Sequence, residues 1–261
     1  MDPDMSPWGA LLGLVAGAVA APLSSVLMDR PPLRDQDNES LRAPWRCKAC
    51  RAPVPLRRSV PLVSWLVQRG RCASCAASIG KRELINDGLC LMVGALTGAF
   101  VGVNAALPAL MVLALVLVPM ALIDLRLHKI PTRLVYPATA VVALLLGVAA
   151  VAQGDPMRLV GAVAGGAAAS AFIWLLVIVY PAGMGDGDAR LCLLLGLGLA
   201  WFGWGHLLYG LMAGFVLGSV VGIGYAFTSG QGRKTQLPFG PWLGSGALLV
   251  ILIAPHIPVL G

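Results

Sequence analysis

The sequence predicts an all-α polytopic membrane protein with about eight transmembrane helices and one small cytoplasmic four-cysteine zinc-binding loop domain. The first observation is composition: 58% of the 261 residues are hydrophobic and only 12% are charged, whereas soluble domains carry about 25% charged residues. The second is a series of charge-free runs, each long enough for a spanning helix of about 20 residues. The third is a single long polar segment, residues 29–83, which interrupts these runs.

The expected helices lie in six runs that contain no Asp, Glu, Lys or Arg. These runs are Met5–Met28, Gly88–Ile123, Leu134–Gly154, Leu159–Gly185, Leu191–Gly232 and Thr235–Gly261. The second and fifth runs can each hold two helices, and we expect the turns at Asn104–Pro108 and near Gly203–His206. Pro7–Met28 is interpreted as a spanning helix and not as a cleaved signal peptide, because acidic residues precede it where a signal peptide carries basic ones.

The polar segment sets the expected topology and domain organisation. It holds most of the 19 Lys and Arg residues, so the positive-inside rule places it in the cytoplasm. The N-terminus is then outside, and three parts are expected: a first transmembrane helix (1–28), a cytoplasmic four-cysteine domain (29–83) and a seven-helix transmembrane domain (84–261). Basic residues gathered between helices serve topology, so we expect no nucleic-acid binding despite the net charge of +7.

Two isolated acidic sites lie within the uncharged part of the chain. Asp124 ends one apolar run, and Gly183–Asp188 contains two further aspartates directly after another run. The helix count brings both sites to the cytoplasmic face, and carboxylates at membrane depth are costly enough to indicate function. Two adjacent carboxylates, one ionised and one protonated, suit peptide hydrolysis. The simpler alternative is a pair of interfacial carboxylates that form ion pairs with Arg126 and Arg190.

The polar segment also carries two C-x2-C pairs, Cys47 with Cys50 and Cys72 with Cys75. This spacing is typical of a four-thiolate zinc site, and a segment of this size needs a metal to fold because it buries little apolar surface. The alternatives are disulfides or a redox-active pair. A cytoplasmic location disfavours structural disulfides, so we predict one structural Zn²⁺ bound by these four cysteines.

Together these features resemble the type IV prepilin leader peptidases, which belong to the GxGD intramembrane aspartic proteases. The resemblance covers nearly the whole chain: the cysteine loop, then Ile123-Asp124 with Ile130-Pro131, then Gly183–Asp188. It implies an intramembrane aspartic endopeptidase, multi-pass in the bacterial inner (cytoplasmic) membrane. This enzyme would cleave the basic leader from type IV prepilin-like substrates at the cytoplasmic face. Those substrates and the lipid bilayer are the implied partners.

The second acidic motif fits G-x-G-D in two registers, one ending at Asp186 and the other at Asp188. In the family the catalytic aspartate is followed two residues later by Lys or Arg and then by Leu, as Asp188 is by Arg190 and Leu191. The resemblance therefore favours Asp188. The glycines around Asp188 allow a tight backbone turn. The expected site comprises Asp124 and Asp188 as catalytic residues, with Gly185, Gly187 and Asp186 as motif support.

Many members of the family also methylate the new N-terminus of the processed substrate with S-adenosylmethionine. That activity is associated with the cysteine-bearing domain and with an acidic residue, typically Glu, after the second cysteine pair. The matching position here holds Asp87, and Glu83-Leu84 stands where Tyr-Pro is usual. The resemblance implies S-adenosylmethionine as a second cofactor and Asp87 as the methyl-transfer residue. The alternative is that Asp87 caps or anchors the start of its helix.

Two other classes of function remain to be weighed against a peptidase. An ion- or proton-coupled transporter would use the intramembrane aspartates for a proton relay or for cation binding. It would favour inverted repeats, and the sequence shows no convincing internal duplication. A membrane scaffold that recruits partners through a zinc loop would leave the aspartates without a role. The peptidase interpretation accounts for both features.

Overall fold

The computed structural model describes residues 6–29, 50, 71–72, 74–77, 81–180, 184–229 and 238–256. Within these residues it contains eight α-helices, as expected. They are α1 (Pro7–Asp29), α4 (Lys81–Val101), α5 (Leu107–Leu127), α6 (Thr132–Gln153), α7 (Pro156–Val179), α8 (Asp186–Ala200), α9 (Trp204–Ser229) and α10 (Gly240–Ile253), with the 3-10 turn η3 (Ala254–His256) after α10. Six of them, all except α8 and α10, are long and apolar enough to cross a membrane. The predicted all-α polytopic fold is confirmed.

The turn expected at Asn104–Pro108 separates α4 from α5, and the side chain of Asn104 builds it. Its Nδ2 donates to the carbonyl oxygen of Val101 at 2.8 Å. Its Oδ1 accepts from the backbone N–H groups of Ala106 at 2.9 Å and Leu107 at 3.1 Å. Asn104 thus satisfies backbone groups at the end of one helix and the start of the next, where no intrahelical partner exists.

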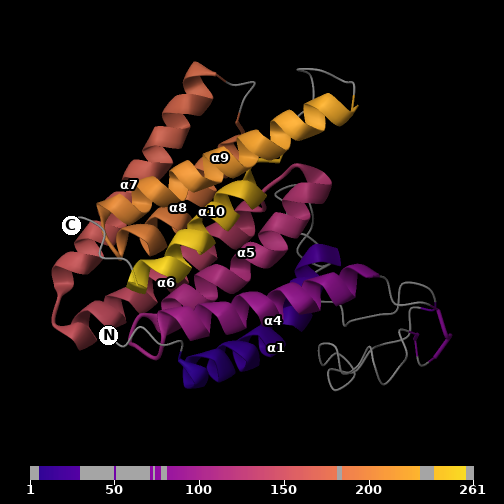
Figure 1. The fold of residues 1–261 in the computed structure, drawn as a ribbon, viewed down its shortest axis with the longest axis horizontal. Helices are drawn as coiled ribbons and strands as arrows, with labels where there is room; N and C mark the ends of the chain where they lie inside the picture. The colour runs from indigo at the N-terminus through magenta and orange to yellow at the C-terminus, as the bar shows by residue number, and fades with distance from the viewer. Residues whose placement is uncertain are drawn as a thin grey trace.

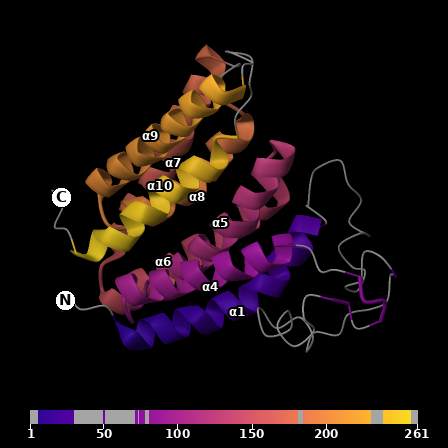
Figure 2. The same ribbon diagram turned by 45° about the vertical axis from the view of Figure 1, so that its right-hand side comes forward.

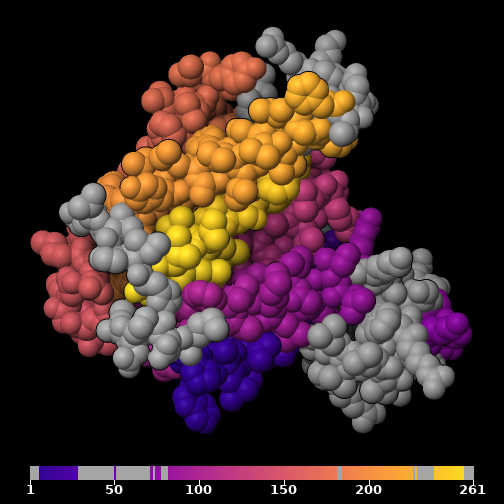
Figure 3. Space-filling view, in the orientation of Figure 1, coloured from indigo at the N-terminus to yellow at the C-terminus, as the bar shows by residue number. Residues whose placement is uncertain are grey.

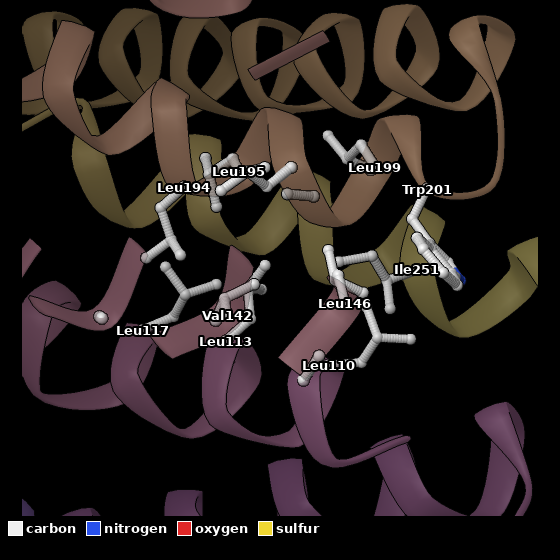
Figure 4. Close-up of a cluster of buried hydrophobic side chains, with 14 of the residues drawn as sticks. Leu110, Leu113, Leu117, Val142, Leu146, Leu194, Leu195, Leu199, Trp201 and Ile251 are labelled. Carbon is white, nitrogen blue, oxygen red and sulfur yellow. The ribbon is translucent and has the colours of Figure 1, made fainter. Parts of the chain in front are cut away.

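Helix α5 occupies the centre of the bundle and is the most deeply buried of the long apolar helices. Figures 1 and 2 show α4 and α1 on one side of it and α10, α8 and α9 on the other. Its buried leucines meet side chains from α6, α8 and α10 in one apolar core (Figure 4). The labelled core residues are Leu110, Leu113, Leu117, Val142, Leu146, Leu194, Leu195, Leu199, Trp201 and Ile251.

Three helix pairs cross at glycines that bring the two backbones close together. In the α1–α4 pair the glycines form a stripe along each helix. A Cβ added at any glycine of this stripe would overlap the backbone of the partner helix. The facing positions are Gly9 with Gly98, Gly13 with Gly94, and Gly17 with Cys90. Close crossings also join α7 to α8 through Gly166 and Gly196, and α9 to α10 through Gly214 and Gly246. Small residues at helix contacts are the usual route to tight packing in lipid.

A buried polar cluster fixes the register of α1 against α4. Asn86 is fully buried; its Oδ1 accepts from the hydroxyl of Ser24. Its Nδ2 donates to the carbonyl oxygen of Ala21 and to Oγ of Ser25, both at 3.0 Å. A buried amide without partners is costly. The free energy lost on breaking these hydrogen bonds therefore opposes any sliding of α1 along α4.

The outer surface of the bundle is apolar. Large hydrophobic side chains are exposed on α1, α6, α7 and α9, and Figure 3 shows the faces of α9, α10 and α4 that lie toward the viewer. A soluble protein rarely exposes so much contiguous apolar surface. The surface fits contact with lipid.

Candidate active site

Asp124 lies in the last turn of α5 and is buried, with 4% of its surface exposed. Its Oδ2 accepts a hydrogen bond from the backbone N–H of Gly240 at 3.2 Å. The helix ends three residues later, at Leu127, because His128 adopts a left-handed conformation with φ of 52° and its N–H closes onto the Asp124 carbonyl at 2.8 Å. Asp124 therefore lies at the end of a central membrane helix and contacts the first residue of α10.

Asp188 lies in the first turn of α8 and is also buried, with 7% of its surface exposed. Its Oδ2 accepts from the backbone N–H of Gly185 at 3.1 Å, and its own N–H donates to the Gly185 carbonyl at 3.1 Å. This reciprocal pair caps the N-terminus of α8. The local sequence thus buries the side chain of Asp188 and fixes its orientation.

The fold brings Asp124 and Asp188 to the same end of the bundle. The two carboxylates are close enough to interact electrostatically. Ile130, in the connection between α5 and α6, joins the two sides of the site. A Cβ at Gly187 would lie 3.1 Å from Ile130 Cβ, and a Cβ at Gly240 would lie 3.0 Å from Ile130 Cδ1. The site is therefore built from the end of α5, the starts of α8 and α10, and the segment that carries Ile130.

Asp186 has different surroundings from Asp188 although it is only two residues away. Its side chain is exposed and forms an ion pair with Nη2 of Arg190. Nη1 of the same arginine donates to the hydroxyl of Thr132 at 2.8 Å, at the start of α6. The interfacial ion pair considered above for Arg190 thus exists, and it involves Asp186. Gly183, the first residue of the other register, lies outside the described residues.

Three of the four predicted zinc ligands are described, and they cluster. The Sγ atoms of Cys50, Cys72 and Cys75 all lie within 4.8 Å of one another. Cys72 opens a tight turn in which its carbonyl accepts from Ala76 and its N–H donates to Ala77, both at 2.8 Å. Such knuckle-like turns present two thiolates to one tetrahedral metal, so the donor set fits Zn²⁺. Cys47 lies outside the described residues.

Asp87 is placed on α4, beside the buried Asn86 cluster and away from the helix start. The Asn86 Nδ2 reaches its Oδ1 at 3.4 Å. Since α4 begins at Lys81, Asp87 is not at the N-cap, and the capping alternative is wrong in that form. The carboxylate remains partly accessible, at the same end of the bundle as Asp124, since Arg126 of α5 hydrogen-bonds the Met28 carbonyl at the end of α1.

Sequence reasoning missed Gly240, the residue whose N–H contacts Asp124. Only its setting in Pro238-Phe239-Gly240-Pro241 could have drawn attention to it, because two prolines around a glycine mark a defined helix start. A cavity of about 620 Å³ lies at the opposite end of the bundle, lined by residues that include Asn104, Gln153 and Trp204. It is not part of the carboxylate site.

Comparisons with known proteins identify the family to which the chain belongs. Residues 13–103 match the bacterial peptidase A24 N-terminal domain, and residues 111–223 match the type IV leader peptidase family. The chain therefore belongs to the type IV leader peptidase family, as its motifs indicated. Six helices able to cross a membrane and this family together fit a multi-pass inner-membrane protein.

Several curated relatives share the name prepilin leader peptidase/N-methyltransferase. The relative from Stutzerimonas stutzeri is 30% identical over 208 residues, covering 79% of this chain and 71% of the relative. That from Pseudomonas aeruginosa is 31% identical, covering 79% and 70%. That from Neisseria gonorrhoeae is 28% identical over 268 residues, covering 93% and 88%. No solved structure matches the chain. Nothing in these matches supports the transporter alternative.

Proposed function

We propose that this protein is an intramembrane aspartic endopeptidase that removes the leader from type IV prepilin-like substrates. We further propose that it methylates the new N-terminus with S-adenosylmethionine. The curated relatives carry both activities in their name. The observation that carries the proposal is the pair of buried carboxylates, Asp124 and Asp188, which come from distant parts of the chain and interact at one end of the bundle.

In the proposed mechanism the two carboxylates share one proton. Close carboxylates do not both ionise readily, so one stays protonated. The ionised group removes a proton from a water molecule, which attacks the scissile carbonyl carbon, while the protonated group donates to the carbonyl oxygen. The two backbone N–H groups that bind Asp124 and Asp188 orient the carboxylates without placing a cation beside them. Each acid can then change its protonation state during the reaction.

The proposed topology places this site and the cysteine loop at the cytoplasmic face, with the N-terminus outside. Two hydrogen bonds support the placement of the carboxylate site and the cysteine loop at the same end of the bundle. Arg126 in the last turn of α5 hydrogen-bonds the Met28 carbonyl near the end of α1, so the carboxylate end of α5 is beside the point where residues 30–80 leave α1. At the other end, the Ser6 N–H donates to the Ala99 carbonyl at 3.0 Å.

The proposed zinc site comprises Cys47, Cys50, Cys72 and Cys75. Its support is the cluster of three sulfurs together with the spacing of the fourth cysteine. A bound Zn²⁺ would supply folding energy to this segment and no catalytic chemistry.

A single co-expression experiment tests both activities. The protein is expressed with a prepilin, and the product is analysed by N-terminal sequencing and intact mass. We expect a leaderless product carrying one added methyl group, and an uncut substrate when Asp124→Asn replaces the wild type. An uncut substrate with the wild type contradicts the peptidase proposal.

The Asp87→Ala variant isolates methyl transfer. If Asp87 serves that reaction, cleavage continues and the product lacks the methyl mass. A methylated product from Asp87→Ala removes Asp87 from the methyl-transfer site. A wild-type product without a methyl group removes the second activity from the proposal.

A further inference from the structure

We propose that Gly240 is a positioning residue for Asp124: its backbone N–H fixes the carboxylate, and its lack of a side chain leaves the space that the carboxylate occupies. This inference rests on the proposed role of Asp124 in hydrolysis. The contact joins residues 116 positions apart in the chain and is buried. It makes the last helix of the bundle part of the carboxylate site.

The start of α10 shows why this N–H is directed at Asp124. The first N–H groups of a helix have no intrahelical acceptor. At α10, Pro241 has no N–H to satisfy, and Trp242 and Leu243 donate to the Phe239 carbonyl at 3.2 and 3.1 Å. Gly240 alone among these first four positions turns to another helix, where it meets Asp124 Oδ2 at 3.2 Å. Asp124 therefore acts as the cap of a helix to which it does not belong.

The space around position 240 also requires a residue without a side chain. A Cβ at position 240 would lie 2.8 Å from Asp124 Oδ2 and 3.4 Å from its Cγ, besides 3.0 Å from Ile130 Cδ1. Gly240 does not have the positive φ that would by itself demand glycine. The requirement for glycine comes from the carboxylate. Any side chain here must move Asp124 or α10.

The two carboxylates are held in the same way. Asp188 Oδ2 accepts from the Gly185 N–H at the start of α8, and Asp124 Oδ2 accepts from the Gly240 N–H at the start of α10. Each oxygen thus faces the N-terminus of a helix, where the peptide dipoles favour negative charge. The difference is that Asp188 is held by its own turn, whereas Asp124 depends on a separate helix.

Gly240→Ala tests the inference, and Gly244→Ala is its matched control. Gly244 lies one turn further along the same buried helix, where a Cβ would meet only Leu117 at the ordinary distance of 3.6 Å. Both changes raise intrinsic helix propensity, so a purely local effect on α10 would be alike in the two. We expect Gly240→Ala to lower kcat by ~100-fold with KM and Tm unchanged, and Gly244→Ala to cleave like the wild type. Equal activities, or a parallel loss in both variants, overturn the inference.

A double variant separates the carboxylate from its apolar neighbour. Ile130→Val removes the Cδ1 atom that a Cβ at 240 would also meet. If Asp124 is the group displaced, Ile130→Val combined with Gly240→Ala stays as inactive as Gly240→Ala alone. Recovery of cleavage in the double variant shows that packing against Ile130 was responsible and overturns the inference.

Hydrogen–deuterium exchange tests the contact without any substrate. Asp124→Ala deletes the acceptor, so the amide of Gly240 should exchange faster than in the wild type. Asp124→Asn keeps a carbonyl acceptor and should exchange like the wild type. Unchanged exchange in Asp124→Ala overturns the inference whether or not prepilins are cleaved. A wild type that leaves prepilins intact, with faster exchange in Asp124→Ala, refutes the proposed function and leaves the contact established.

Discussion

Asp186 and Asp188 show how two residues of one type acquire different surroundings within a single helical turn. Positions two apart on an α-helix are separated by about 200° around the axis. The first turn of α8 therefore directs Asp186 outward, to its ion pair with Arg190, and Asp188 inward, where it is buried. An exposed ion pair contributes little to stability, whereas the buried carboxylate has a high desolvation cost that a functional role would explain.

This difference predicts the outcome of replacing each aspartate by asparagine. Asp124→Asn and Asp188→Asn should each abolish cleavage, because an amide neither ionises nor holds the shared proton. Asp186→Asn should keep most of the activity, since it removes only a surface ion pair. Cleavage of a prepilin by purified protein measures all three variants. An active Asp188→Asn with an inactive Asp186→Asn would assign catalysis to the other register.

At the scale of elements, the glycine crossings hold helices together where the hydrophobic effect does not distinguish protein from lipid. A Cβ at Gly13 would overlap the carbonyl group of Gly94, whereas a Cβ at Gly161 in α7 meets nothing within 4 Å. We expect Gly13→Ala to destabilise the protein by about 1–3 kcal/mol and Gly161→Ala to be neutral. Thermal unfolding in one detergent compares the pair. Equal stabilities would contradict the importance of the crossing.

The cysteine loop should hold a metal ion in the purified protein. Purified protein should contain one zinc per chain, and Cys75→Ala should lose it because three thiolates hold the metal less tightly than four. Cys192→Ala is the control: this residue is buried in α8, outside the sulfur cluster. Elemental analysis gives the zinc content of each. Two disulfides by mass and no metal would refute the zinc site.

The whole molecule has two ends, and the proposed topology assigns them to opposite sides of the membrane. Gln153→Cys, at the end of α6, should react with a membrane-impermeant maleimide in intact spheroplasts. Lys129→Cys, in the connection between α5 and α6, should react only after lysis. Both residues are exposed, so accessibility within the fold does not decide the result. The reverse labelling pattern would invert the topology.

Much of this architecture could be predicted from charge alone. Charge-free runs located eight helices, and the polar Asn104 marked a turn that its side chain builds. Charge-free runs predict too late a start for α8, because a run without charges excludes Asp186 and Asp188, although acidic residues favour a helix N-terminus. The contact between Gly240 and Asp124 could not be predicted, although the prolines around Gly240 mark a helix start. The role of this glycine arises from contact with a residue far along the chain, and neither charge nor spacing records such a contact.

The stripe of glycines on α1 has a consequence for the order in which the protein is made. This stripe packs against the backbone of α4, yet α1 ends at Asp29 and α4 begins only at Lys81. At ~5–20 residues per second, translation therefore leaves the first helix in the membrane for several seconds before its partner emerges. During that interval Ser24 and Ser25 have no Asn86 to bind, and the glycine face is open to any other small-residue helix nearby. The nascent chain is thus open to wrong pairing of α1 until α4 has been synthesised.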